Sequence, residues 1–237
     1  MVILMTGTVE PNSTHVAVKD TFVRLQEYCE ALSYCRDQFP GTDIYFLENS
    51  SFDLDNNILF SSIVKNCRIK VLRFPRSEMF HKGKGYQEFE MLDQAVERLK
   101  DNYDIAVKLT GRYKVMNLKQ VLKTEFDCIM ADCHRTPEVT QTNVFCFHFN
   151  FYRQHLSGKF KEADDEKGIF IEKVIYSYLK KNHLMNSVTM FPVGPRISGV
   201  SGSYGTSVSR NKWKMKIIDI ERMALRIFNI HEFPFEI

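Results

Sequence analysis

The sequence has little net charge, no long apolar run and no close match to a nucleotide-hydrolase motif. Its 32 basic and 29 acidic residues give a formal charge of +3, too small to indicate a nucleic-acid-binding protein. No stretch approaches the roughly 18 uninterrupted apolar residues of a membrane span, and the apolar opening Met1–Met5 is too short for a secretory signal. We therefore expect a cytoplasmic protein that has no nucleic acid as a partner.

The six cysteines do not follow the spacing of a disulfide framework or a zinc site. Four of them lie in or beside apolar runs, namely Cys67, Cys128, Cys133 and Cys146. Buried free thiols are the simpler interpretation in a reducing compartment. Neither Cys128 nor His148 stands at a ligand spacing from Cys133-His134, so we predict no metal site there. A Cys/His hydrolase is compatible with the composition but lacks an orienting motif.

The chain is 237 residues long and 44% hydrophobic, enough for one large domain with a substantial core. Short apolar runs alternate with segments of helical periodicity, which predicts an α/β fold with a mixed, mostly parallel sheet flanked by helices. In the first half we expect strands over Val2–Met5, Asp43–Leu47, Arg68–Phe74 and Asp104–Leu109, with helices over Val16–Phe39 and from Phe89 to Leu99.

The second half continues this alternation with less regularity. We expect strands over Phe126–Met130 and Asn143–Phe151, a mobile charged loop over Ser157–Lys167, and helices over Ile169–Lys181 and Asp219–Ile230. Ile197–Thr206 is dense in glycine and serine and is interpreted as a loop that closes over a site. The basic stretch Arg210–Lys216 surrounds the sole tryptophan, and suits either a solvated strand or contact with an anionic membrane surface.

The strand over Asp104–Leu109 organises the predicted site, because ligands of open α/β sheets bind at the carboxyl ends of the strands. Lys108, Thr110, Gly111, Arg112 and Tyr113 lie at that end. Two earlier strands end in polar residues as well, as Thr6-Gly7-Thr8 and as Glu48-Asn49-Ser50.

A loop rich in glycine and lysine opens the helix that precedes this strand. It contains Lys84 and Gly85, followed by Glu88. Backbone N–H groups at such a helix start favour an anion. The Walker spacing is absent, so this is not a P-loop.

In this order, the segments resemble GT-A type nucleotide-sugar glycosyltransferases, in particular the small bacterial enzymes of O-antigen and capsule assembly. The resemblance runs over residues 2–205 and rests on Arg24–Tyr28 with Ala31-Leu32, Glu48–Ser50, Lys82–Glu88, Lys108–Tyr113 and Ile197–Ser203. It implies a nucleotide-binding half over residues 1–125 and an acceptor and catalytic half over residues 126–237. It also implies a nucleotide-sugar donor, with a UDP-sugar first among the candidates, and a glycan or lipid-linked acceptor at the cytoplasmic membrane face.

The sequence departs from the GT-A pattern at its metal site. That pattern ends the fourth strand in Asp-x-Asp, which holds a divalent ion on the diphosphate, whereas here the strand ends in Thr110-Gly111-Arg112. Fixed cations can also stabilise a leaving diphosphate. We therefore expect Lys84, Lys108 and Arg112 to take this role and no cofactor to be required, with Mn²⁺ or Mg²⁺ as the alternative through Asp132.

The resemblance places a catalytic carboxylate near a helix start beyond the fourth strand. Transfer with inversion needs this carboxylate to take the acceptor's proton. Glu172 matches the position and Asp132 is its competitor, although either could serve only as a helix or turn cap. Arg135, Ser198, Gly199 and Ser201 are assigned to the acceptor or the lid. A nucleotidyltransferase and a non-catalytic nucleotide-binding subunit remain the alternatives.

Overall fold

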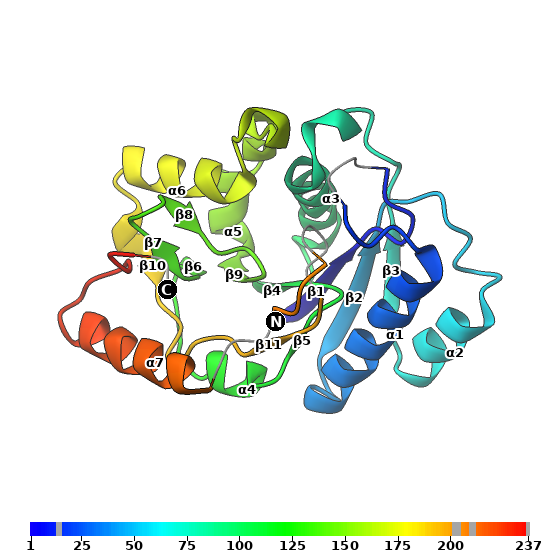
Figure 1. Cartoon of the computed structure of the whole chain (residues 1–237), viewed down its shortest axis with the longest axis horizontal. Helices are drawn as coiled ribbons and strands as arrows, with labels where there is room; N and C mark the ends of the chain where they lie inside the picture. Colours follow the sequence, from blue (N-terminus) through cyan, green and yellow to red (C-terminus); the bar gives the residue numbers. More distant parts are fainter. Residues whose placement is uncertain (13–15, 201–204, 209–211, 236–237) are drawn as a thin grey trace.

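The computed structural model describes residues 1–12, 16–200, 205–208 and 212–235. Its largest element is a seven-stranded sheet of order β10-β6-β9-β4-β1-β2-β3 (Figure 1). The strands are β1 (Val2–Gly7), β2 (Asp43–Glu48), β3 (Lys70–Arg73), β4 (Ile105–Thr110), β6 (Ile129–Met130), β9 (Val144–His148) and β10 (Val188–Thr189). Only β9 runs antiparallel to its neighbours, β4 and β6. The predicted mixed, mostly parallel sheet is therefore confirmed.

Helices cover both faces of the sheet. They are α1 (Thr21–Gln38), α2 (Ile58–Asn66), α3 (Lys84–Leu99), α4 (Leu118–Val121), α5 (Phe149–Phe151), α6 (Ile171–Lys181) and α7 (Lys212–Ile227). Single turns of 3-10 or π type occupy Phe80–Lys82, Tyr152–Leu156, Lys159–Glu162, Asp165–Lys167 and Met185–Ser187. Two-residue strands pair in two small ribbons, β5 (Lys114–Val115) with β11 (Ile197–Ser198) and β7 (Cys133–His134) with β8 (Val139–Thr140).

Alternation along the central strands divides the core into two layers. Val2 and Leu4 of β1 point toward α3 and α6, whereas Ile3 and Met5 point toward α1 and α2. All six residues of β1 are buried, as a parallel strand covered on both faces requires. The chain leaves β1 toward β2 and β3, then returns to β4 on the other side of β1. This reversal lies between β1 and β4, where α/β sheets bind their ligands.

Several element boundaries differ from the sequence prediction. α1 begins at Thr21 rather than Val16, because Asp20 caps it by accepting from the Val23 N–H. The strand predicted over Asn143–Phe151 ends at His148, and its last three residues form α5. The strand predicted over Phe126–Met130 is confined to β6. α2 has no counterpart in the prediction.

The C-terminal region differs most from the prediction. Lys212–Lys216, considered as a solvated strand, forms the start of α7, and this helix ends at Ile227 rather than Ile230. Cys133 and Cys146 are buried as predicted, whereas Cys67 and Cys128 are only partly buried. In the described part of the chain, no helix combines the length and the apolar character needed to cross a membrane.

Candidate active site

The cavity at the reversal between β1 and β4 has a volume of about 170 Å³. β1 ends there in Thr6-Gly7-Thr8, and β4 ends there in Thr110. Because β9 is antiparallel, its start lies at the same edge of the sheet, and the Thr110 N–H donates to the Asn143 carbonyl over 3.0 Å. The segment after β1, the buried side of α1, one face of α3 and the first turn of α6 complete the lining.

Nine residues chosen from the sequence line this cavity. They are Thr6, Gly7, Thr8, Lys84, Glu88, Thr110, Arg112, Tyr113 and Glu172. The lining also includes residues that the sequence analysis did not assign: Pro11, Asn12, Val16, Arg24, Tyr28, Gln87, Met91, Thr142 and Asn143. Arg24 and Tyr28 are four positions apart on the buried side of α1. A charged residue on an otherwise apolar helix face is the signal that could have identified them.

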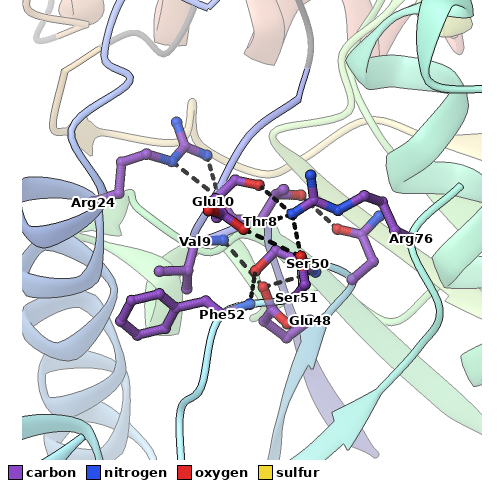
Figure 2. Close-up of polar contacts among 10 residues, drawn as sticks. Thr8, Val9, Glu10, Arg24, Glu48, Ser50, Ser51, Phe52 and Arg76 are labelled. Atoms are coloured by element: carbon purple, nitrogen blue, oxygen red, sulfur yellow. Dashed lines mark hydrogen bonds and ion pairs between the residues drawn. The ribbon is translucent and has the colours of Figure 1, made fainter.

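Hydrogen bonds hold the segment after β1 in place (Figure 2). Arg24 donates to the Thr8 carbonyl through Nε at 2.9 Å and through a terminal nitrogen at 2.6 Å. The Glu48 carboxylate accepts from the backbone N–H of Val9 at 3.1 Å and of Ser50 at 2.9 Å. The loop that bounds the cavity is thus fixed from both α1 and β2.

These contacts correct the role predicted for Glu48-Asn49-Ser50. Glu48 is 1% exposed and binds backbone N–H groups of its own chain. Asn49 accepts from the Thr8 hydroxyl at 2.6 Å and donates to the Gln87 carbonyl. None of the three lines the cavity. They hold the loop that bounds the cavity instead of facing the cavity.

Lys108 is also placed differently from the prediction. Its side chain points into the protein from β4, has no exposed surface, and pairs with Glu88 at 2.6 Å. Its Nζ donates as well to the Thr142 carbonyl at 2.9 Å. Lys108 therefore fixes Glu88 and the start of β9, and it has no surface to offer a diphosphate.

The Gly-Lys-Gly loop holds a carboxylate that belongs to the protein. The Lys84 N–H at the start of α3 donates to Asp165 at 3.0 Å. Gly83 has a φ of 98°, and a Cβ there would collide with Asp165. Gly85 lies against Ile171 of α6 and stays outside the lining. The predicted anion position at this helix start is thus taken by Asp165, while Lys84 still lines the cavity.

Arg112 connects the cavity to the segment predicted as a lid, and Gly111 ties the end of β4 to β1. The Arg112 Nε pairs with Glu27 at 2.7 Å, and a terminal nitrogen donates to the Val200 carbonyl at 2.8 Å. The Gly111 N–H donates to the Thr6 carbonyl at 2.8 Å. Gly199 packs on the Tyr113 ring. Ser198 faces a second cavity, and Ser201 lies outside the described residues.

Glu172 places a second carboxylate, besides Glu88, in the lining of the cavity. It lies in the first turn of α6 and accepts from the Thr142 hydroxyl at 2.9 Å. Burial raises its pKa above the ordinary value, and the negative charge of Glu88 adds to this. The Thr142 hydrogen bond and Lys108 oppose the shift. A raised pKa brings a carboxylate closer to the range of an efficient general base.

Asp132 does not reach this cavity. Both of its oxygens bind Arg222 of α7, one of them over 2.8 Å. The pair lies in the second cavity, of about 690 Å³, whose lining also contains His134, Asn143, Phe191, Arg196 and Ser198. Asn143 lines both cavities, so the two adjoin. Arg135 lines neither of them and pairs with Glu232 at 2.8 Å.

The lining of the first cavity does not fit a divalent metal ion. Its carboxylates are Glu88 and Glu172, and Glu88 already pairs with Lys108. Within the described residues, no three His, Cys, Asp or Glu side chains are grouped in a way that could hold a metal.

Comparison with known proteins shows the fold. No protein-family model matches the chain, and no curated protein sequence matches it. Among solved structures, the galactosyltransferase LgtC with donor and acceptor sugar analogues is 14% identical and has a TM-score of 0.50, covering 80% of this chain and 73% of that one. An active-site mutant of LgtC is 13% identical with a TM-score of 0.50, and the match covers 80% of this chain and 72% of that one. A CMP-2-keto-3-deoxy-manno-octonic acid synthetase with CTP is 11% identical with a TM-score of 0.47, and the match covers 96% of this chain and 98% of that one. The likeness to LgtC confirms the predicted GT-A-like fold.

Proposed function

We propose that this protein is a glycosyltransferase that uses a nucleotide-sugar donor. The observation that carries the proposal is the cavity at the sheet reversal, where Glu172 with a raised pKa faces the same space as Lys84 and Arg112. Arg24 is a third cation in that lining, against two carboxylates. This combination suits a reaction that removes a proton from one group and builds negative charge on another. The fold shared with LgtC supports the same reaction class.

The proposed reaction is a displacement at the anomeric carbon of the donor sugar. An acceptor hydroxyl attacks the anomeric carbon while the bond from that carbon to the phosphate oxygen breaks. The nucleoside diphosphate leaves with the electron pair, and Lys84 and Arg112 stabilise its charge. For a transfer that inverts the anomeric centre, the Glu172 carboxylate takes the proton of the hydroxyl.

Each half of the chain has its own task in this proposal. Residues 1–125 supply Thr6-Gly7-Thr8, Lys84 and Arg112 for the donor, preferably a UDP-sugar. Residues 126–237 supply Glu172 and the second cavity for a glycan or lipid-linked acceptor, in the assembly of a surface polysaccharide. The shared residue Asn143 supports this division, because it places the second cavity next to the site of transfer.

The first cavity is smaller than the roughly 300–1,000 Å³ of most ligand sites. A nucleotide sugar therefore requires part of the cavity wall to move outward. We propose that Pro11 and Asn12 move, because the hydrogen bonds of Arg24 and Glu48 hold Thr8 and Val9 and not these two lining residues. We expect donor binding to change the protection of residues 8–12 against hydrogen exchange.

The test is thermal stabilisation by a panel of nucleoside diphosphates and nucleotide sugars, followed by an assay of sugar transfer. A ligand that binds the native state raises the melting temperature. Each ligand is run with EDTA and again with Mn²⁺ or Mg²⁺. Stabilisation in EDTA supports a site built on Lys84 and Arg112, and stabilisation only with metal rejects it.

Release of pyrophosphate from a nucleoside triphosphate and a sugar phosphate would replace this proposal with a nucleotidyltransferase. Tight binding without turnover would indicate a binding subunit.

A further inference from the structure

α7 has two apolar faces, one buried against the protein and the other largely exposed. The inner face carries Met215, Ile218 and Arg222, each 5% exposed or less, and lines the second cavity. Residues three or four positions apart share one side of a helix. By this spacing, the opposite side forms what we name the outer face of α7: Trp213, Ile217, Ile220, Met223 and Ile227. These five side chains are between 60 and 74% exposed.

Five large apolar side chains in one exposed row mark an interaction surface, whereas isolated ones need no explanation. α7 lies along one edge of the molecule, and no helix or strand is drawn on its outer side (Figure 1). A depression of about 600 Å³ follows this row, between Ile220, Met223 and Ile227 on one side and Pro192 and Val193 on the other. The exposed Phe228 continues the apolar surface past the end of the helix. The surface is therefore both apolar and grooved.

The charges beside the outer face are mostly positive. Lys214, Lys216 and Arg226 are exposed on α7, and the Lys216 ammonium lies 4.8 Å from the centre of the Trp213 ring. Asp219 is turned toward the protein, where it accepts from the Gly194 N–H at 2.7 Å and pairs with Arg196. Glu221 is the remaining acidic residue of the helix and is partly buried.

We propose that the outer face of α7 docks the protein on an anionic phospholipid membrane. The helix lies in the plane of the interface, with its apolar row among the acyl chains and its lysines at the headgroups. Tryptophan and lysine favour this boundary, because each combines an apolar body with a polar end. Docking holds the second cavity, on the inner side of α7, within about one helix diameter (~10 Å) of the headgroups. The proposal does not rest on the function proposed above.

Trp213 is the sole tryptophan of the chain and so reports directly on docking. The purified protein is titrated with vesicles of phosphatidylcholine alone and of phosphatidylcholine mixed with phosphatidylglycerol. With the anionic vesicles we expect a saturable blue shift of the Trp213 emission, together with quenching by brominated acyl chains. We expect a weaker response to neutral vesicles and a response that falls with salt, since the lysines contribute through screened charge.

Variants separate the apolar contribution from the charge. Ile217→Gln combined with Ile220→Gln is expected to lower the partition coefficient at least tenfold, because both side chains leave water on docking. Lys214→Gln and Lys216→Gln are each expected to lower it about fivefold on anionic vesicles only. Ile58→Gln is the matched control, since Ile58 is equally apolar and 87% exposed but lies on α2. It should bind like the wild type.

Two results would overturn the proposal. The first is an unchanged Trp213 emission and no co-sedimentation with anionic vesicles at low salt. The second is a concentration-dependent dimer without lipid that the Ile217→Gln/Ile220→Gln variant dissociates, which assigns the outer face to a second copy of the chain. All variants change exposed side chains, so their melting temperatures should stay near that of the wild type and exclude misfolding as the cause.

Discussion

Replacing Glu172 with glutamine removes the proposed base while keeping the size of the side chain. A positioned general base contributes about 10²–10⁴ in rate, so we expect kcat to fall by this factor, or about 3–5 kcal/mol of transition-state stabilisation. The Michaelis constant for the donor should change little, because Lys84 and Arg112 remain. The measurement is steady-state sugar transfer over a range of pH. In the wild type, kcat/KM should rise as pH passes through the raised pKa of Glu172, and this limb should vanish in the variant.

The stability of the same variant gives an independent test. Since burial raises the pKa of Glu172 in the folded state, the folded protein binds this proton more tightly than the unfolded chain. The contribution of Glu172 to stability therefore falls as pH rises from its unfolded to its folded pKa, and above that it stays unfavourable. Glutamine removes this cost, so the melting temperature of Glu172→Gln should be no lower than that of the wild type at neutral pH. In acid the wild type no longer carries the cost, so the melting temperature of the variant should fall relative to that of the wild type.

Glu166→Gln is the control for both measurements. Glu166 is exposed and lies six residues before Glu172, in the turn that leads to α6. Its replacement should leave rate and melting temperature unchanged. Transfer by Glu172→Gln at the wild-type rate would exclude Glu172 as the base. A large loss of stability in that variant at neutral pH would instead identify Glu172 as a structural residue.

Other residues of the same region allow three further predictions. Thr142→Val removes a hydrogen bond to the Glu172 carboxylate that lowers its pKa, so the rising limb of kcat/KM should move to higher pH; an unmoved limb contradicts this coupling. Lys108→Met leaves Glu88 without its cation and should cost about 3 kcal/mol, or a fall of ~6–12 °C in melting temperature. The control Lys180→Met breaks an exposed pair of 3.0 Å and should cost less than about 1 kcal/mol; equal losses would refute the buried role of Lys108. Gly111→Ala places a Cβ 2.5 Å from the Thr6 carbonyl oxygen and should cost ~1–3 kcal/mol by urea unfolding, whereas Gly41→Ala meets no atom within 4 Å and should be neutral.

The sequence located every strand of the seven-stranded sheet except β10, and the edge at which the cavity lies. Central parallel strands are covered on both faces, so they show as short continuous apolar runs such as Val2–Met5. Polar residues directly after such runs must lie at the carboxyl edge, which is why Thr6-Gly7-Thr8, Thr110 and Arg112 were found. Glu172 was chosen through the resemblance to GT-A glycosyltransferases, and periodicity located only the helix that it starts. These inferences depend on local periodicity, which a sequence displays directly.

Only the tertiary structure decided which polar side chains face the cavity. Lys108 and Arg112 look equivalent in the sequence, yet the fold pairs Lys108 with Glu88 of α3 inside the protein and Arg112 with Glu27 of α1 at the cavity. Asp132 looks like a catalytic carboxylate until α7, 90 residues later, brings Arg222 against it. Asp165 lies in a turn 81 residues after Lys84, and its carboxylate accepts the Lys84 N–H at the start of α3. A charge is bound by whichever opposite charge the fold brings near it, and pairings between distant parts of the chain leave no periodic signal in the sequence.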